Sequence, residues 1–221
     1  HGSGRFTLAK LLSPAIQLAA DGFIVGDDLA FSLKQAENRL KRFESTAAIF
    51  MTPDGGALPR GANLQQIDLA QTLGRIAREG TKAFYEGEIA QKLVAAVNGA
   101  GGQWTADDLR NYRAIEREVV RGTYRGHEIV SMPPPSSGGV HLVQILNILE
   151  GFDLKAAGAN SADAIHLFAE ASKLAYADRS EYLGDPDFVK VPVQGLTSKR
   201  YAETLRAQID PAKARPGKDI K

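Results

Sequence analysis

An apolar run near the middle of the chain constrains the fold most strongly. After two serines and two glycines, most of the residues from Val140 to Leu149 are apolar, and Gly151 ends the run. The length of the run and its glycine stop are typical of a helix. Because few polar residues interrupt it, we expect this helix to be buried on most of its sides.

The segment before this run has the clearest β-strand pattern in the sequence. Between residues 114 and 132, apolar and β-branched residues form two short groups on either side of Tyr124-Arg125-Gly126. This pattern predicts two strands joined by a tight turn. The three prolines at 133–135 end the second strand, since proline cannot donate a hydrogen bond to a β-ladder.

Helical periodicity marks much of the remaining sequence. Helices are predicted at residues 8–21, from 27 to about 40, from about 65 to 79, at 88–97, from 105 with a capping-box spacing, from 161 to about 183, and at 198–208. The predicted fold class is therefore α+β, predominantly helical with a β-hairpin. At 221 residues the chain can bury about 70% of its unfolded surface, so we expect a single domain over residues 1–221.

Composition excludes several classes of function. With 27 basic and 26 acidic residues, the chain has no net field that would concentrate nucleic acid or anionic lipid. It contains no cysteine, so a disulfide, a thiolate metal site and a cysteine nucleophile are excluded. No apolar run approaches the roughly 20 residues of a membrane span. Because the sequence begins with His1, we expect that something upstream was removed, omitted or replaced by a tag.

The serine–glycine segment, Ser136, Ser137, Gly138 and Gly139, has two interpretations. Hydroxyls and free amides at a helix start can hold an anion or an oxyanion. The more ordinary interpretation is a helix N-cap, with glycines that allow close packing. The sequence favours the second interpretation, because helix caps far outnumber anion sites.

Other polar groups give weaker signals. His127, His141 and His166 lack metal-ligand spacing, and although His141 lies one turn after Ser137, no third group or nucleophile elbow accompanies the pair. Packed or hydrogen-bonded histidines are therefore expected.

A solvated or inter-helix ion-pair network is expected for the charged residues of the helix at 161–183, where Asp178-Arg179 can still orient a neighbouring loop. The acidic turn at 185–187 lacks the alternating ligands of a calcium loop. The residues of the expected network, in the helix at 161–183, are Glu170, Lys173, Tyr176, Asp178, Arg179 and Glu181.

Read as strings, several segments resemble one enzyme family. Residues 131–150 (SMPPPSSGGVHLVQILNILE) closely resemble a segment of the large subunit of bacterial γ-glutamyltranspeptidases. Residues 175–192 (AYADRSEYLGDPDFVKVP) and 8–16 with 21–23 resemble the same family. Shorter matches at 84–87, 107–112 and 124–126 follow in the family's order, so the resemblance extends from about residue 4 to residue 214.

The resemblance implies an N-terminal-nucleophile hydrolase with an αββα sandwich, of which this chain is a large-subunit fragment. Members of the family are zymogens: the precursor cleaves itself, and the freed threonine of the small subunit attacks the amide of glutathione or another γ-glutamyl compound. Water or an acceptor amine then resolves the acyl-enzyme, without a metal or an organic cofactor. The expected partners are therefore the small subunit of the same precursor and γ-glutamyl substrates, and the expected location is the periplasm or the medium.

Compared with the complete family pattern, this sequence lacks the catalytic parts. The resemblance places the nucleophilic threonine after Lys221 and the arginine that binds the substrate α-carboxylate before His1. It implies no catalytic residue in this chain, and it makes Ser136, Ser137, Gly138 and Gly139 candidates for a structural role or for a cleft wall. The 221-residue chain is expected to be inactive by itself and to expose apolar surface.

Two alternatives to a γ-glutamyl hydrolase and transferase remain open. Some relatives of the family are acylases that act on β-lactam side chains, and substrate preference depends mostly on residues outside this chain. The third hypothesis is a non-catalytic helical interaction domain.

Overall fold

The computed structural model describes residues 4–220, so the expectation about His1 lies outside the described residues. The chain divides into two compact units, residues 1–114 and 115–221. The single domain expected from the sequence stays a prediction. In the described residues, no helix is both long enough and apolar enough to cross a membrane.

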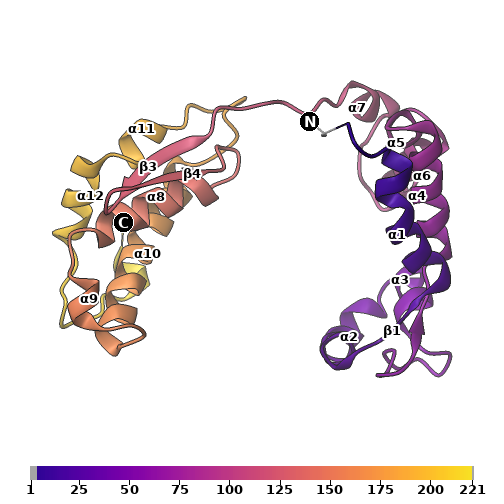
Figure 1. The fold of residues 1–221 in the computed structure, drawn as a ribbon, viewed down its shortest axis with the longest axis horizontal. Helices are drawn as coiled ribbons and strands as arrows, with labels where there is room; N and C mark the ends of the chain where they lie inside the picture. The colour runs from indigo at the N-terminus through magenta and orange to yellow at the C-terminus, as the bar shows by residue number, and fades with distance from the viewer. Residues whose placement is uncertain (1–3, 221) are drawn as a thin grey trace. The chain divides into compact units, whose positions relative to one another are not determined.

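The first unit is mainly helical (Figure 1). Its central packing is between α1 and α4, and the Gln66 amide reinforces it by donating to the Ala19 carbonyl at 2.9 Å. The two short strands form one antiparallel pair that the sequence patterns did not predict. The elements of this unit are α1 (Leu8–Asp21), β1 (Phe23–Ile24), α2 (Asp27–Leu40), α3 (Glu44–Phe50), β2 (Asn63–Leu64), α4 (Ile67–Glu79), α5 (Lys82–Tyr85), α6 (Glu88–Gly99) and α7 (Ala106–Asn111).

Local signals in the sequence explain where these helices begin and end. The Thr7 hydroxyl accepts from the Lys10 amide at 3.2 Å at the start of α1, and Gly22 ends that helix with φ of 79°. A capping box between Thr105 and Asp108 starts α7, as its spacing predicts.

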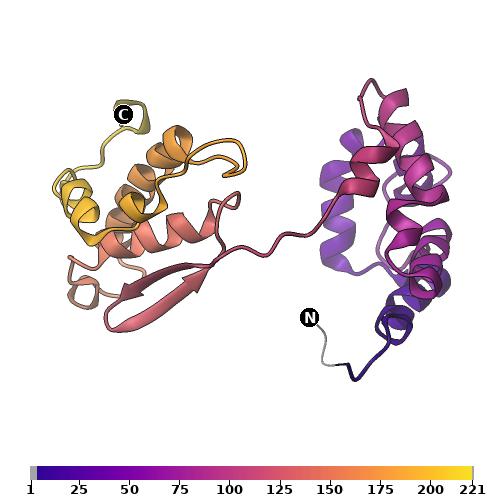
Figure 2. The same cartoon turned by 90° about the horizontal axis from the view of Figure 1, so that it is seen from above.

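The second unit contains the predicted hairpin and the apolar helix. Its elements are β3 (Val120–Tyr124), β4 (His127–Ser131), α8 (Gly138–Leu149), α9 (Leu154–Ala157), α10 (Ala162–Tyr182), α11 (Val193–Leu196), α12 (Lys199–Arg206) and the 3-10 turn η1 (Gly217–Asp219). The hairpin is antiparallel and pairs Val120 with Ser131 at its open end (Figure 2). Its turn contains Arg125 and Gly126, both with positive φ.

Helix α8 is the centre of the second unit, as its apolar sequence predicts. The hairpin lies along one side of it, and α10 and α12 pack on others (Figure 1). Val140 and Ile148 are completely buried, and a side chain of that size contributes about 1.5–3 kcal/mol when it is fully removed from water. A Cβ on Gly122 would lie 2.5 Å from a methyl of Val143, so the hairpin approaches α8 where β3 has no side chain.

The observed elements confirm the predominantly helical α+β character and the β-hairpin. Patterns in the sequence did not predict four short helices, α3, α5, α9 and α11, each of seven residues or fewer. So few residues cannot display a helical period.

Candidate functional site

The serine–glycine segment connects the hairpin to α8. A Cβ on Gly139 would lie 2.1 Å from the carbonyl oxygen of Met132, far inside van der Waals contact. On Gly138 the nearest atom would be the Ser136 hydroxyl at 3.5 Å, an ordinary contact. The prediction that glycine allows close packing is therefore confirmed at Gly139, where the backbone leaving β4 presses against the first turn of α8.

The hydroxyl of Ser137 has a different partner from the one expected of a cap. Ser137 occupies the N-cap position of α8, but its side chain caps no amide of the helix. It accepts a hydrogen bond from Nε of Arg179 at 3.1 Å. The Ser136 hydroxyl accepts from the Gly138 amide at 3.3 Å. Helix α10 thus holds the start of α8 through Arg179, in agreement with the expectation that Asp178-Arg179 orients a neighbouring loop.

His141 is part of the packing between α8 and α10. Its Nε2 lies 2.9 Å from the carbonyl oxygen of Ala175, so Nε2 carries the proton and donates it. Its ring centroid lies 4.8 Å from that of Tyr176. Burial lowers the pKa of His141, because the charged imidazolium loses its hydration. A neutral ring bonded to the backbone is a structural residue, and Ser137 takes its hydrogen bond from Arg179 rather than from His141.

The other two histidines are placed differently. Nε2 of His166 bonds to the carbonyl oxygen of Asp210 at 2.8 Å, whereas His127 is exposed on β4. The expectation of packed or hydrogen-bonded histidines is confirmed for His141 and His166. Within residues 4–220, no cluster of three or more histidine, aspartate or glutamate side chains has the arrangement of a metal site.

Two carboxylates of α10 are buried and form neither the solvated network nor the inter-helix ion pairs that were expected. Glu170 is 3% exposed and pairs with Lys173, and it also accepts from the Arg215 amide at 3.2 Å. Burial opposes ionisation of Glu170, but the hydrogen bonds from Lys173 and Arg215 outweigh it and lower its pKa. The pairing at i,i+3 was expected. The burial was not, because α10 turns this face toward α12 and the C-terminal segment.

Asp178 is the second buried carboxylate, and two neutral groups bind it. Its Oδ1 accepts from the Tyr201 hydroxyl at 3.0 Å, and its Oδ2 accepts from the side-chain amide of Gln144. Burial, together with the hydrogen bond from the Tyr201 hydroxyl to Asp178, raises the pKa of Tyr201 to about 12. The three side chains come from α8, α10 and α12, so one polar cluster connects the three helices.

Sequence reasoning missed Gln144 and Tyr201. Gln144 is, with His141 and Asn147, one of three polar residues in a mainly apolar helix, and it is 1% exposed, so it needs a buried hydrogen-bond partner. That interruption was the available signal in the sequence. Tyr201 gave a weaker one, since it lies one turn before Leu205 on the buried face of α12.

The acidic turn at 185–187 is occupied by an ion pair. Asp187 pairs with Arg117 at 2.6 Å, and the hydrogen bond from Arg117 lowers the pKa of Asp187. Oδ1 of Asp185 accepts from the Asp187 amide at 3.0 Å. The ion pair therefore connects the segment before β3 to the segment after α10.

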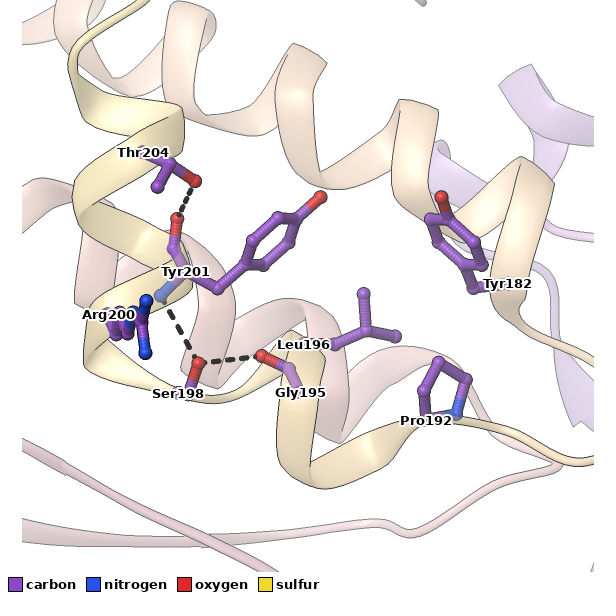
Figure 3. Close-up of a pocket in the computed structure, with 8 residues that line it drawn as sticks. All are labelled: Tyr182, Pro192, Gly195, Leu196, Ser198, Arg200, Tyr201 and Thr204. Carbon is purple, nitrogen blue, oxygen red and sulfur yellow. Dashed lines mark hydrogen bonds between the residues drawn. The ribbon is translucent and has the colours of Figure 1, made fainter.

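A pocket of about 360 Å³ lies beside this cluster (Figure 3). Pro192 and Leu196 form its apolar wall, and Tyr182 and Tyr201 extend their rings alongside. The hydroxyls of Ser198 and Thr204 bond to the backbone at Gly195 and Tyr201, respectively. The pocket is thus mainly an apolar surface next to the buried carboxylate.

Comparison with known proteins gives consistent results. The family model described as gamma-glutamyltranspeptidase matches residues 1–221. The glutathione hydrolase proenzyme of Escherichia coli (strain K12) is 51% identical over 219 residues, which are 99% of this chain and 38% of that protein. The acylase ACY 1 proenzyme of Pseudomonas sp. (strain SE83) is 45% identical over 212 residues, which are 96% of this chain and 38% of that protein.

Solved structures agree with the sequence matches. The γ-glutamyltranspeptidase of Helicobacter pylori superposes with a TM-score of 0.91 at 42% identity, over 99% of this chain and 63% of that one. The cephalosporin acylase of Bacillus halodurans gives a TM-score of 0.84 at 32% identity, over 93% of this chain and 39% of that one. The chain spans about 38% of the length of the Escherichia coli glutathione hydrolase proenzyme and of the acylase ACY 1 proenzyme.

Proposed function

Because this chain belongs to the γ-glutamyltranspeptidase family, we propose that it is part of a hydrolase and transferase of glutathione and other γ-glutamyl amides. The observation that carries this proposal is the match over residues 1–221, together with 51% identity to a glutathione hydrolase proenzyme. The acylase relatives, at 45% and 47% identity, favour a β-lactam side-chain acylase as the second candidate.

In this proposal the chemistry belongs to a threonine outside the chain. The precursor cleaves itself, and the threonine freed at the start of the small subunit attacks the γ-glutamyl carbonyl, with its own amino group as base. This chain contributes no catalytic residue and requires no metal or organic cofactor. The description of the relatives as proenzymes supports a precursor, and their greater length leaves room for a second subunit.

The chain then serves as scaffold. Its helices cover one side of the αββα sandwich of the complete protein, whose sheets come from other segments. The serine–glycine segment forms part of the cleft wall, and the contacts that hold it, at Gly139 and between Arg179 and Ser137, support this role. The similarity to bacterial glutathione hydrolases supports a periplasmic or secreted location.

The test uses the complete protein and the 221-residue chain side by side. We expect the complete protein to release the chromophore from a γ-glutamyl anilide, and the chain by itself to release none. Turnover by the chain would contradict the claim that its residues do not catalyse.

A second substrate separates the two candidate functions. The complete protein is also incubated with an acylated cephalosporin, and the values of kcat/KM are compared. A higher kcat/KM for the cephalosporin would replace the γ-glutamyl proposal with the acylase. Activity on neither substrate would refute both.

A further inference from the structure

A second pocket lies between α10, α12 and the C-terminal turn η1 of the second unit. Its volume is about 680 Å³, within the range of roughly 300–1,000 Å³ that is usual for sites that bind small molecules. Gly217 and Ile220 border it at the C-terminal turn. The residues that give it chemical character are Tyr176, Asp178, Glu181 and Tyr182 of α10 and Tyr201 of α12.

Asp178 brings a buried negative charge to this pocket without a positive partner. It is 9% exposed, and both of its oxygens accept hydrogen bonds from neutral donors, as an ionised carboxylate does. In the described part of the chain, no lysine, arginine or histidine forms an ion pair with it. Buried charges in proteins are normally paired, so this carboxylate lacks a counter-ion.

Three basic residues near Asp178 are already engaged, and the first of them, His141, bonds through its ring to the carbonyl oxygen of Ala175. Arg179, the neighbour of Asp178 in the sequence, donates to Ser137. Lys173 also borders the pocket, but it donates to Glu170 and to the carbonyl oxygen of Arg215. Glu170 thus balances the positive charge of Lys173. The negative charge of Asp178 stays uncompensated.

Tyrosine rings surround the same space. Tyr176 and Tyr182 are 58% and 46% exposed, so part of each ring is accessible. Tyr201 is held in place by its bond to Asp178, and Figure 3 shows the hydroxyl of Tyr182 pointing away from Pro192. The faces of aromatic rings attract cations, and Glu181 adds a second negative group at the border.

We propose that this pocket binds a small primary ammonium ion. The ammonium group lies against Asp178, whose oxygens each have a further lone pair to accept from it. The carbon chain of the ligand packs against the rings of Tyr182 and Tyr201. A preformed carboxylate and a fixed ring are suited to this task because neither has to be ordered when the ligand arrives.

The test measures binding of n-butylammonium to the complete protein by calorimetry at constant ionic strength, with 1-butanol as the neutral ligand of the same size. We expect n-butylammonium to bind and 1-butanol to bind at least tenfold more weakly. The variant Asp178→Asn keeps the shape and removes the charge, and should lose about tenfold or more in affinity. Asp28→Asn makes the same change at an exposed position of α2 and should bind as the parent does.

A second pair of variants decides the matter if Asp178→Asn does not fold. Tyr182→Leu removes an accessible ring and should weaken binding of n-butylammonium about two- to fivefold, whereas Tyr182→Phe keeps the ring and should bind normally. Equal affinity for n-butylammonium and 1-butanol, no binding of the cation, or unchanged affinity in both Asp178→Asn and Tyr182→Leu would overturn the proposal.

Discussion

Gly139 shows how a single hydrogen atom in place of a side chain can determine a local structure. The backbone that leaves β4 passes so close to the first turn of α8 that a methyl group on Gly139 would lie 2.1 Å from the Met132 carbonyl oxygen. The obstacle is backbone rather than the end of a flexible side chain. Relief would therefore require the hairpin to move away from α8.

We predict that Gly139→Ala lowers the free energy of unfolding by about 1–3 kcal/mol, the usual cost of overpacking. Gly138→Ala is the matched control, since its methyl group meets a hydroxyl at 3.5 Å and adds helix propensity. Unfolding in urea, followed by circular dichroism, measures both variants. Equal stability of the two would mean that the segment tolerates a side chain and that the close approach is not required.

Residue by residue, the sequence predicts the backbone better than the polar partners. The close packing at Gly139 and the hydroxyl cap at Thr7 could be predicted, because each depends on residues only a few positions away in the sequence. The partners of Ser137 and Asp178 could not. Arg179 lies 42 residues from Ser137, and Gln144 lies 34 residues from Asp178, so only the packing of α8 on α10 brings them together.

At the scale of the element, α12 completes the C-terminal end of α8. Nε and Nη2 of Arg206 each donate at 2.8 Å, to the carbonyl oxygens of Ile148 and Asn147. These carbonyls lie in the last turn of α8, where the helix dipole is negative and the acceptors have no partner within the helix. One guanidinium thus supplies two hydrogen bonds and a favourable charge.

Replacing Arg206 with methionine should lower the free energy of unfolding by about 2 kcal/mol, because two carbonyls in a partly buried place lose their donor. Arg200→Met is the matched control on the same helix, at an exposed arginine whose side chain forms no hydrogen bond or ion pair among residues 4–220. Thermal unfolding of both variants gives the comparison. The role assigned to Arg206 fails if its variant melts at the same temperature as the control.

Elements of ten residues or more were predicted well because each carries its own period and its own end signals. Helices α1, α2, α8 and α10 appear within about two residues of their predicted bounds. The β1–β2 pair is different, since two residues per strand display no alternation and the pairing joins Phe23 to Leu64 across the intervening helices. Such pairing depends on tertiary structure that no local pattern specifies.

For the whole molecule, both units leave large apolar side chains in contact with solvent. Large apolar side chains that are more than half exposed include Phe31, Phe43, Ile115, Met132 and Phe188.

This surface predicts that the 221-residue chain associates with itself or needs further segments of the complete protein to cover it. Sedimentation velocity over a range of concentrations should show species larger than the monomer. Co-expression with the remaining part of the protein should give a defined complex, because its sheets would cover the apolar helix faces. A monodisperse monomer that unfolds cooperatively would show that the two units suffice for stability, and the scaffold role would then lose its physical basis.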